Sequence, residues 1–350
     1  MNDDREQKTL IYDLGLPELE AILGEWQEPP YRARQIWQGL YRQLWDDPEQ
    51  FSALPLRLRQ KLAGRFSFSN LEVETVLFST DGETRKILFR LPDRQPLEAV
   101  LMRYMKRRTL CISTQAGCAM GCVFCATGQM GFRRHLSSGE IIEQVLYYAR
   151  ILQAEGDRVT NVVVMGMGEP FHNYEATLAA IDRLSHPEGF NLGARRVTIS
   201  TVGLVPMIRR FAAERRQVNL AISLHAADDE LRTSMLPINK KYPIVELMAA
   251  CREYVERTHR RITFEWALIR EVNDTPEQAR KLSGLLKGLL CHVNVIPLNP
   301  TDKFSGQATT LERARAFQDI LEHNGIPCTI RLRRGIDIQA GCGQLAGQAN

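Results

Sequence analysis

The sequence predicts a mixed α/β fold in which a parallel, barrel-like sheet follows a small helical module. The main observation is an alternation of strand-like and helix-like segments from residue 96 onward. Strands such as Asn161–Met165 are apolar on both faces, which is typical of parallel strands covered by helices. Six or so β/α units in series indicate a barrel-like parallel sheet, open or complete. We expect a partial (β/α)6 barrel. A chain of 350 residues has room for this domain and a smaller one.

Residues 1–95 differ from the rest and predict an accessory module of helices followed by a hairpin. Tyr31–Leu44 places apolar and aromatic side chains on one helical face, and a second short helix is expected at Leu56–Leu62. Between residues 71 and 91, two alternating strands flank an Asp81-Gly82 turn, which is the pattern of a hairpin. We interpret the aromatic stripe of the first helix as core rather than as a platform for stacking bases.

Residues 96–350 are expected to form the main unit. Its predicted strands are Thr109–Thr114, Asn161–Met165, Arg196–Thr201, Asn219–Leu224, Arg261–Leu268, His292–Ile296 and Cys328–Leu332. Capping patterns predict helix starts at Ser137 (with Glu140), at Thr309 (with Glu312) and at Thr275, where proline follows. In such folds the chemistry collects at the carboxyl ends of the strands.

Composition and charge indicate a protein of a reducing compartment that binds a polyanion. No apolar run is long enough to span a membrane, and the acidic N-terminus is unlike a signal peptide, so we expect a cytoplasmic protein without membrane contact. No carboxylate occurs between Glu98 and Glu140, whereas basic residues gather there and near the C-terminus: Arg103, Lys106, Arg107, Arg108, Arg133, Arg134, Arg331, Arg333 and Arg334. Nucleic acid is the natural partner of such a surface, and a solvated basic loop is the alternative.

Three closely spaced cysteines, Cys118, Cys122 and Cys125, form a C-x3-C-x2-C pattern among small residues. A closed iron–sulfur cubane takes four cysteines, and no fourth thiol follows within a hundred residues. The pattern therefore predicts a [4Fe–4S] cluster with one iron open to a non-protein ligand. The alternative is a zinc site completed by Cys111 or by a histidine such as His135.

Small or polar residues follow four of the predicted strands, where a ligand would bind. They are Gly168 and Glu169; Ser200; Ser223, Leu224 and His225; and Asn299. A lone His225 is more often a satisfied core histidine. Four such strand ends beside a cluster loop favour a cofactor site.

Cys111 and Cys342 stand apart from the cluster motif, and three further cysteines (Cys251, Cys291 and Cys328) lie in apolar patterns typical of packing. On composition alone, Cys111 and Cys342 are ordinary cysteines. For an electron-poor aromatic carbon, two thiols would supply a methyl carrier and a group that closes a disulfide to release the product. Such a reaction also needs a base, and Glu98 is the acid on the approach to Cys111.

The C-x3-C-x2-C run resembles the radical S-adenosylmethionine (SAM) superfamily, and motifs along the whole chain resemble the RlmN family. They include Met-Gly-Met-Gly-Glu-Pro170, Ser-Leu-His-Ala226, Val-Asn-Val-Ile-Pro-Leu-Asn-Pro300 and Ala-Gly-Cys-Gly-Gln-Leu-Ala-Gly347. The resemblance implies a radical-SAM barrel with an RNA-binding accessory domain. It also implies methylation of adenine C2 in 23S rRNA and in tRNA beside the anticodon, with an electron donor such as flavodoxin.

The resemblance also implies residue roles. Cys118, Cys122 and Cys125 would hold the cluster, and Cys342 would carry the methyl group, with Cys111 as its partner in a transient disulfide and Glu98 as proton acceptor. The SAM ligands would be Gly168, Glu169, Ser200, Ser223, Leu224, His225 and Asn299.

Two stretches depart from the family pattern, Met102–Tyr104 and Leu332–Asp337, and both concern loops expected to face RNA. They leave open the preference between rRNA and tRNA. A Cfr-type enzyme that methylates adenine C8 is the runner-up function. A non-catalytic RNA-binding protein with structural zinc is the alternative from another class.

Overall fold

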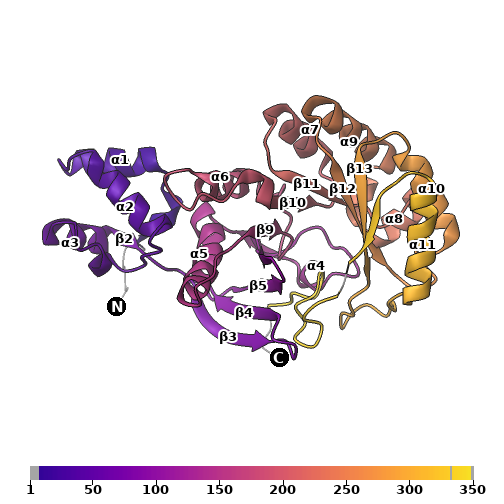
Figure 1. Ribbon diagram of the computed structural model, residues 1–350, viewed down its shortest axis with the longest axis horizontal. Coiled ribbons are helices and arrows are strands. Elements are labelled where there is room, and N and C mark those ends of the chain that lie inside the picture. The colour runs from indigo at the N-terminus through magenta and orange to yellow at the C-terminus, as the bar shows by residue number, and fades with distance from the viewer. Residues whose placement is uncertain (1–7, 332, 348–350) are drawn as a thin grey trace.

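The computed structural model describes residues 8–331 and 333–347. It is a mixed α/β structure in which helices flank one large sheet, and helices α1–α3 form a separate group at one end (Figure 1). The helices are α1 Leu16–Glu25, α2 Tyr31–Tyr41, α3 Leu56–Arg65, α4 Ala126–Met130, α5 Ser138–Ala154, α6 Tyr174–Ser185, α7 Val205–Glu214, α8 Asp229–Met235, α9 Ile244–Thr258, α10 Pro276–Leu286 and α11 Leu311–His323. None of these described helices is long and apolar enough to cross a membrane.

The large sheet has ten strands in the order β14-β13-β12-β11-β10-β9-β6-β5-β4-β3, and two small sheets pair β1 with β2 and β7 with β8. The strands are β1 Thr9–Leu10, β2 Phe66–Ser67, β3 Glu72–Phe78, β4 Thr84–Arg90, β5 Pro96–Tyr104, β6 Arg107–Cys111, β7 Gln115–Gly117, β8 Phe132–His135, β9 Asn161–Val164, β10 Val197–Thr201, β11 Asn219–Ser223, β12 Ile262–Leu268, β13 Cys291–Pro297 and β14 Cys328–Ile330.

The parallel part of the sheet confirms the predicted partial barrel. Strands β6, β9, β10, β11, β12, β13 and β14 pair in parallel, and helices connect each to the next. The barrel is not closed, because β3 and β14 are the two ends of the strand order. All carboxyl ends of the parallel strands therefore meet at one side of the sheet, as the sequence analysis expects.

An antiparallel extension carries the predicted hairpin into the same sheet. Strand β3 pairs with β4, and β4 pairs with β5, which in turn pairs with β6. Strand β5 is not among the predicted strands, although its run Leu97-Glu-Ala-Val-Leu-Met is mostly apolar. Strands β3 and β4 thus share the sheet of the main unit, and the boundary near residue 95 stays a prediction.

Most predicted boundaries differ from those of the structure by one to three residues, and three of the differences have a visible cause or consequence. The strand expected at Thr109–Thr114 begins earlier, at Arg107, because it pairs back onto β5, and it ends at Cys111. The last strand ends at Ile330, and Leu332 lies outside the described residues. Helix α11 is capped by Thr310, which accepts from the Arg313 amide, so the predicted cap at Thr309 is wrong by one residue. Thr309 instead donates to Asp274.

The aromatic stripe of α2 packs into the core, as predicted. Trp37 and Tyr41 are buried, and their rings lie 4.4 Å apart. The Trp37 ring also meets the ring of His186 at the end of α6, with 5.4 Å between centroids. These rings join the helical module to the barrel, so their faces are not available to stack on bases.

The segment after β14 crosses the open side of the barrel. It leaves one edge of the sheet and returns to the hairpin at the other edge, where the Asp337 carboxylate accepts from the amide and hydroxyl of Thr80 at 2.7 and 2.8 Å. Figure 1 shows this yellow segment running past α4 towards β4. We call residues 333–347 the C-terminal segment.

A buried arginine fixes the carboxyl ends of two central strands. Arg232 on α8 is fully buried and donates to the carbonyls of Val202 (2.7 Å), Leu224 (3.1 Å) and Ser223 (3.3 Å). These carbonyls follow or end β10 and β11, so one guanidinium ties together the carboxyl ends of both strands. Burial lowers the pKa of this guanidinium to about 10, so it stays charged at neutral pH.

Replacement of Arg232 by methionine should destabilise the protein strongly. The change removes the guanidinium from three carbonyls, of which that of Leu224 keeps the Ala226 amide as a donor. Hydrogen bonds to a charged group contribute roughly 1.5–3 kcal/mol each. We expect a loss of at least about 3 kcal/mol in the free energy of unfolding, measured by urea titration. Arg209→Met is the control, because its ion pair with Glu253 is half-exposed and should matter little. Equal midpoints for the two variants would contradict this role.

Candidate cofactor and catalytic site

The cysteine motif lies on a tight loop between β7 and α4. The loop turns through Gly117 (φ +75°), where a Cβ atom would lie only 1.9 Å from the Gly131 carbonyl oxygen. The Cys118 amide donates to the same carbonyl at 3.1 Å. At Gly128, a Cβ atom would lie 3.0 Å from the backbone nitrogen of Cys122. A side chain is excluded at Gly117, and one at Gly128 would press on the Cys122 backbone, so the loop closes tightly around its thiols.

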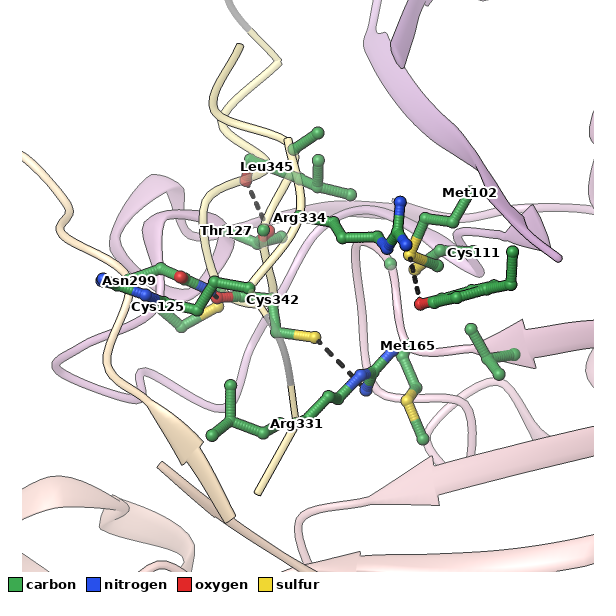
Figure 2. A pocket seen from close by; sticks show the side chains of 18 residues that line it. Met102, Cys111, Cys125, Thr127, Met165, Asn299, Arg331, Arg334, Cys342 and Leu345 are labelled. Atoms are coloured by element: carbon green, nitrogen blue, oxygen red, sulfur yellow. Dashed lines mark hydrogen bonds between the residues drawn. The ribbon is translucent and has the colours of Figure 1, made fainter. Parts of the chain in front are cut away.

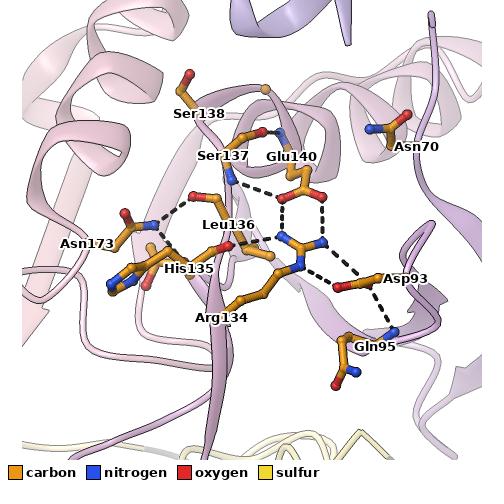
Figure 3. Close-up of polar contacts among 12 residues, drawn as sticks. Asn70, Asp93, Gln95, Arg134, His135, Leu136, Ser137, Ser138, Glu140 and Asn173 are labelled. Atoms are coloured by element: carbon orange, nitrogen blue, oxygen red, sulfur yellow. Dashed lines mark hydrogen bonds and ion pairs between the residues drawn. The ribbon is translucent and has the colours of Figure 1, made fainter. Parts of the chain in front are cut away.

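An ion-pair network anchors the exit of this loop (Figure 3). Arg134 on β8 donates through two nitrogens to Glu140, both at 2.8 Å, and through Nε to Asp93 at 2.6 Å. Glu140 also completes the capping box with Ser137 at the start of α5, which confirms that prediction. Because Asp93 follows the hairpin, the network joins the hairpin, the cluster loop and α5.

The three thiols are buried or nearly so, and burial raises the pKa of each. The pKa of Cys118 rises to about 12, that of Cys122 rises well above its usual value, and that of Cys125 also rises. Thiolates here need a cation beside them. No three described side chains of the metal-binding types gather closely enough to hold a single metal ion. Three such thiols lie on one glycine-lined loop, which is the donor set that the sequence predicts for an iron–sulfur cluster.

A cavity of about 160 Å³ brings most of the predicted cofactor residues together. Its lining includes Cys122, Cys125, Gly168, Glu169, Ser200, Ser223, His225, Asn299 and Cys342. Leu224 does not line it, because its side chain is fully buried. Cys118 is also missing from the lining.

Glu169 is a buried carboxylate with a fixed orientation. It accepts from the amides of Phe171 (3.0 Å) and Val202 (2.9 Å), and its own amide donates to Gln115 at 2.8 Å. Burial raises the pKa of Glu169 to about 7. A cationic ligand in the cavity would therefore stabilise the ionised form.

His225 is both a cavity residue and a satisfied buried histidine. Its backbone is left-handed (φ +61°), and its Nδ1 accepts from the Ala267 amide at 2.9 Å. Burial lowers the pKa of His225 to about 3, so the ring is neutral. With Nδ1 accepting, the proton of the ring lies on Nε2.

A second cavity contains the two distant thiols, Cys111 and Cys342 (Figure 2). Both are free, Cys111 on β6 and Cys342 exposed on the C-terminal segment. Figure 2 shows the Cys342 thiol pointing toward Arg331, whose Nη1 lies 3.9 Å from the sulfur. Burial raises the pKa of Cys111 to about 12, and the nearby Arg331 opposes this rise. Cys125, Asn299 and Cys342 line both cavities, so the thiol pair borders the cofactor cavity.

Hydrogen bonds fasten the C-terminal segment to the cluster loop. The Ala126 amide donates to Gly343 at 2.7 Å, and Thr127 donates to the carbonyl of Leu345 at 2.6 Å. Asn299 donates to the carbonyl of Cys342 at 3.0 Å. One predicted cofactor residue thus holds the backbone of the exposed cysteine.

Glu98, like Cys118 and Leu224, is a predicted site residue that lines neither cavity. Its side chain is fully buried and pairs with Lys86, with 2.9 Å between Nζ and Oε1. Its second oxygen accepts from the Gly347 amide at 2.9 Å.

Only part of the predicted basic surface is free of carboxylates. Arg103 and Arg108 pair with Glu155 and Asp157, and Arg134 is engaged as above. Arg331, Arg333 and Arg334 line the thiol cavity, and Arg334 also lies 3.8 Å from the Glu83 carboxylate. The guanidinium of Arg334 lies 4.6 Å from the centre of the Tyr104 ring, so the two stretches that depart from the family pattern meet at this mouth.

Sequence reasoning missed three polar residues of the site. Glu265 lines the cofactor cavity and accepts from Asn294, Gln115 supports Glu169, and Lys86 pairs with Glu98. The available signal was a charged residue within an apolar strand, as in Thr-Arg-Lys86-Ile-Leu-Phe and Thr-Phe-Glu265-Trp-Ala.

Comparisons with known proteins agree with this geometry. The radical SAM superfamily model matches residues 112–282, and the N-terminal domain model of ribosomal RNA large subunit methyltransferases matches residues 10–67. The probable dual-specificity RNA methyltransferase RlmN of Chloroflexus aurantiacus is 51% identical over 98% of this chain and 94% of its own. The dual-specificity RNA methyltransferase RlmN 1 of Myxococcus xanthus is 51% identical over 96% of this chain and 93% of its own.

A solved structure extends the agreement to three dimensions. The crystal structure of a radical SAM methyltransferase from Sphaerobacter thermophilus superposes with a TM-score of 0.95, at 51% identity over 97% of this chain and 100% of that one. The matching models cover the helical module and the cluster loop, and the relatives cover nearly the whole chain. The chain therefore belongs to the RlmN family of dual-specificity RNA methyltransferases, within the radical SAM superfamily.

Proposed function

We propose that the protein methylates C2 of adenosine in 23S rRNA and in tRNA, using Cys342 as methyl carrier and Cys111 as its partner in a transient disulfide. The observation that supports this most directly is the cavity that contains both free thiols and adjoins the cofactor cavity. The relatives named above are dual-specificity RNA methyltransferases, which is why both RNAs are proposed.

The residues fit the two cofactors that the superfamily implies. Cys118, Cys122 and Cys125 would hold a [4Fe–4S] cluster, and the Glu169 carboxylate would accept from the amino group of SAM. Gly168, Ser200, Ser223, His225 and Asn299 would contact the rest of SAM from the strand ends, and Leu224 would contribute through its backbone. When bound, the cluster supplies the electron that splits SAM into methionine and a 5'-deoxyadenosyl radical.

Cys342 and Cys111 would transfer the methyl group, and Glu98 would accept the proton. An adenine ring carbon between two nitrogens is electron-poor and cannot attack a sulfonium methyl, so Cys342 takes the methyl first. The S-methyl carbon would bond to the ring after the 5'-deoxyadenosyl radical has taken one of its hydrogen atoms, and the adduct would lose the ring proton and one electron, which the cluster would accept. Cys111 would then attack the Cys342 sulfur, so that the disulfide forms as the carbon–sulfur bond breaks. The electron pair of that bond would go to the methylene carbon, which takes up a proton and becomes the methyl group. Glu98 would accept the ring proton, which requires its carboxylate to leave the Gly347 amide.

The RNA would approach over Arg331, Arg333, Arg334 and Tyr104, which line the thiol cavity. Guanidinium groups pair with phosphates and stack on bases. We place the reaction in the cytoplasm, where both RNAs occur and thiols stay reduced, with a protein such as flavodoxin as electron donor. Nucleoside mass spectrometry of rRNA and tRNA, from cells with and without the protein, tests the proposal. C8-methyladenosine as the product would mean a Cfr-type enzyme.

Gly117→Ala should prevent cluster binding. The added Cβ would overlap the Gly131 carbonyl, and φ is positive there, so the loop cannot close. Iron and sulfide in the anaerobically purified variant should fall to background. Gly284→Ala is the matched control, because its Cβ meets nothing within 4 Å, and it should keep its iron. Full iron content in Gly117→Ala, or zinc without iron in the unmodified protein, would refute the cluster assignment.

SAM affinity should depend on pH through Glu169. Burial raises the pKa of this carboxyl to about 7, and only the ionised form attracts the amino group of SAM. Protonation grows as pH falls, so the affinity should drop about tenfold per pH unit below 7 and level off above it. Equilibrium binding to the reconstituted protein measures this. Glu169→Gln should bind weakly at every pH, and an unchanged pH slope in that variant would contradict the assignment.

Cys342→Ala should abolish methyl transfer to RNA while SAM cleavage continues. Product analysis by mass spectrometry measures the first and release of 5'-deoxyadenosine the second. Cys251→Ala is the control, because this cysteine is buried in the core away from both cavities, and it should retain methyl transfer. Recovery of C2-methyladenosine with Cys342→Ala would refute the carrier role.

A further inference from the structure

Lys86 and Glu98 form a buried ion pair on the inner face of the sheet. Lys86 on β4 pairs in register with Val100 on β5, and Glu98 pairs with Leu88, so the two charged side chains share one face. The opposite face, with Ile87 and Ala99, packs toward α5, where Tyr148 donates to the Ala99 carbonyl at 2.7 Å. The inner face is therefore the one that the C-terminal segment covers.

Both members of the pair hold the C-terminal segment. Glu98 accepts from the Gly347 amide at 2.9 Å, and Lys86 Nζ donates to the Gln339 carbonyl at 3.4 Å. These two contacts fall on either side of Cys342. The ion pair therefore binds the C-terminal segment at two points, one before Cys342 and one after it.

An ion pair in this place needs a reason beyond fold stability. The side chains of Lys86 and Glu98 are 3% and 0% exposed, and removing two charges from water costs several kcal/mol per ion. Apolar neighbours such as Val100 and Leu345 surround the same face, so an apolar pair would pack there without that cost. What an apolar pair cannot supply is a donor for Gln339 and an ionised acceptor for Gly347.

We propose that Lys86 is a positioning residue: it orients the Glu98 carboxylate and, through it, fastens the Cys342 segment across the open barrel. Glu98 holds Gly347 in the fastened state, so release of the segment and exposure of the carboxylate are one event. The coupling of segment release to proton transfer by Glu98 rests on the proposed function. The attachment of the C-terminal segment by Lys86 and Glu98 does not.

Hydrogen exchange in the anaerobically purified full-length protein tests the fastening without RNA or SAM. In Lys86→Met, peptides that cover residues 335–347 should exchange at least about tenfold faster, because the Gly347 amide loses an oriented acceptor. Peptides from β10–β12 should be unchanged. Lys86→Arg keeps a cation and should restore most of the protection. Lys281→Met, which removes an ion-paired lysine on α10, is the control and should leave the segment protected.

A variant without buried charge separates this role from simple misfolding. In Lys86→Met with Glu98→Gln, neither site carries a charge, so the fold is not burdened by an unpaired ion. The segment should still exchange faster, because Gln339 has no donor and the Gly347 acceptor is neutral. Protection equal to that of the unmodified protein, in either Met variant, would overturn the proposal. Faster exchange everywhere in both variants would also overturn it, since it would mean a general structural role.

Alkylation gives a second readout on the thiol itself. Iodoacetamide should modify Cys342 at a different rate in Lys86→Met, and Lys86→Arg should return the rate toward the original, as measured by peptide mass spectrometry. If exchange and alkylation respond as expected but no variant affects methyl transfer, the fastening stands and the proposed catalytic role of Glu98 fails. Unchanged exchange together with lost methyl transfer would refute the fastening alone.

Discussion

Burial of three thiols in a loop that has no room for side chains is the constraint on which the site depends. The loop closes because Gly117 lacks a Cβ atom, and its exit is held by Arg134 between two carboxylates. The thiols it buries are unfavourable as anions without a cation, which their raised pKa values express. Thiols in this position stay protonated unless a cation lies beside them.

The fold and most of the site could be predicted because they depend on local patterns. Apolar runs marked the parallel strands, and residues just after them, such as Ser200 and Asn299, had to meet at one side of the sheet. Short-range chemistry also placed the helix cap at Ser137. The strand β5 was missed because its apolar run, interrupted by Glu98, shows neither the helical period nor the strict alternation of a strand.

What could not be predicted depends on contacts between distant parts of the chain. No local pattern shows that Lys86 meets Glu98, or that Glu98 meets an amide 249 positions further along. The role of Arg232 at the strand ends could not be predicted either, because a buried arginine on a short helix cannot be told from an exposed one in the sequence. The contacts of Lys86 and Glu98 form only when the fold brings the C-terminal segment back to the hairpin.

The open barrel has a consequence for the size of substrate that it admits. A closed barrel can widen only by breaking a ladder of backbone hydrogen bonds between strands. Here the gap between β14 and β3 is bridged by the irregular C-terminal segment, which is held to the hairpin by side-chain contacts such as that of Asp337 with Thr80. The aperture can therefore adjust to a bulky folded polynucleotide while every strand pairing of the sheet stays intact.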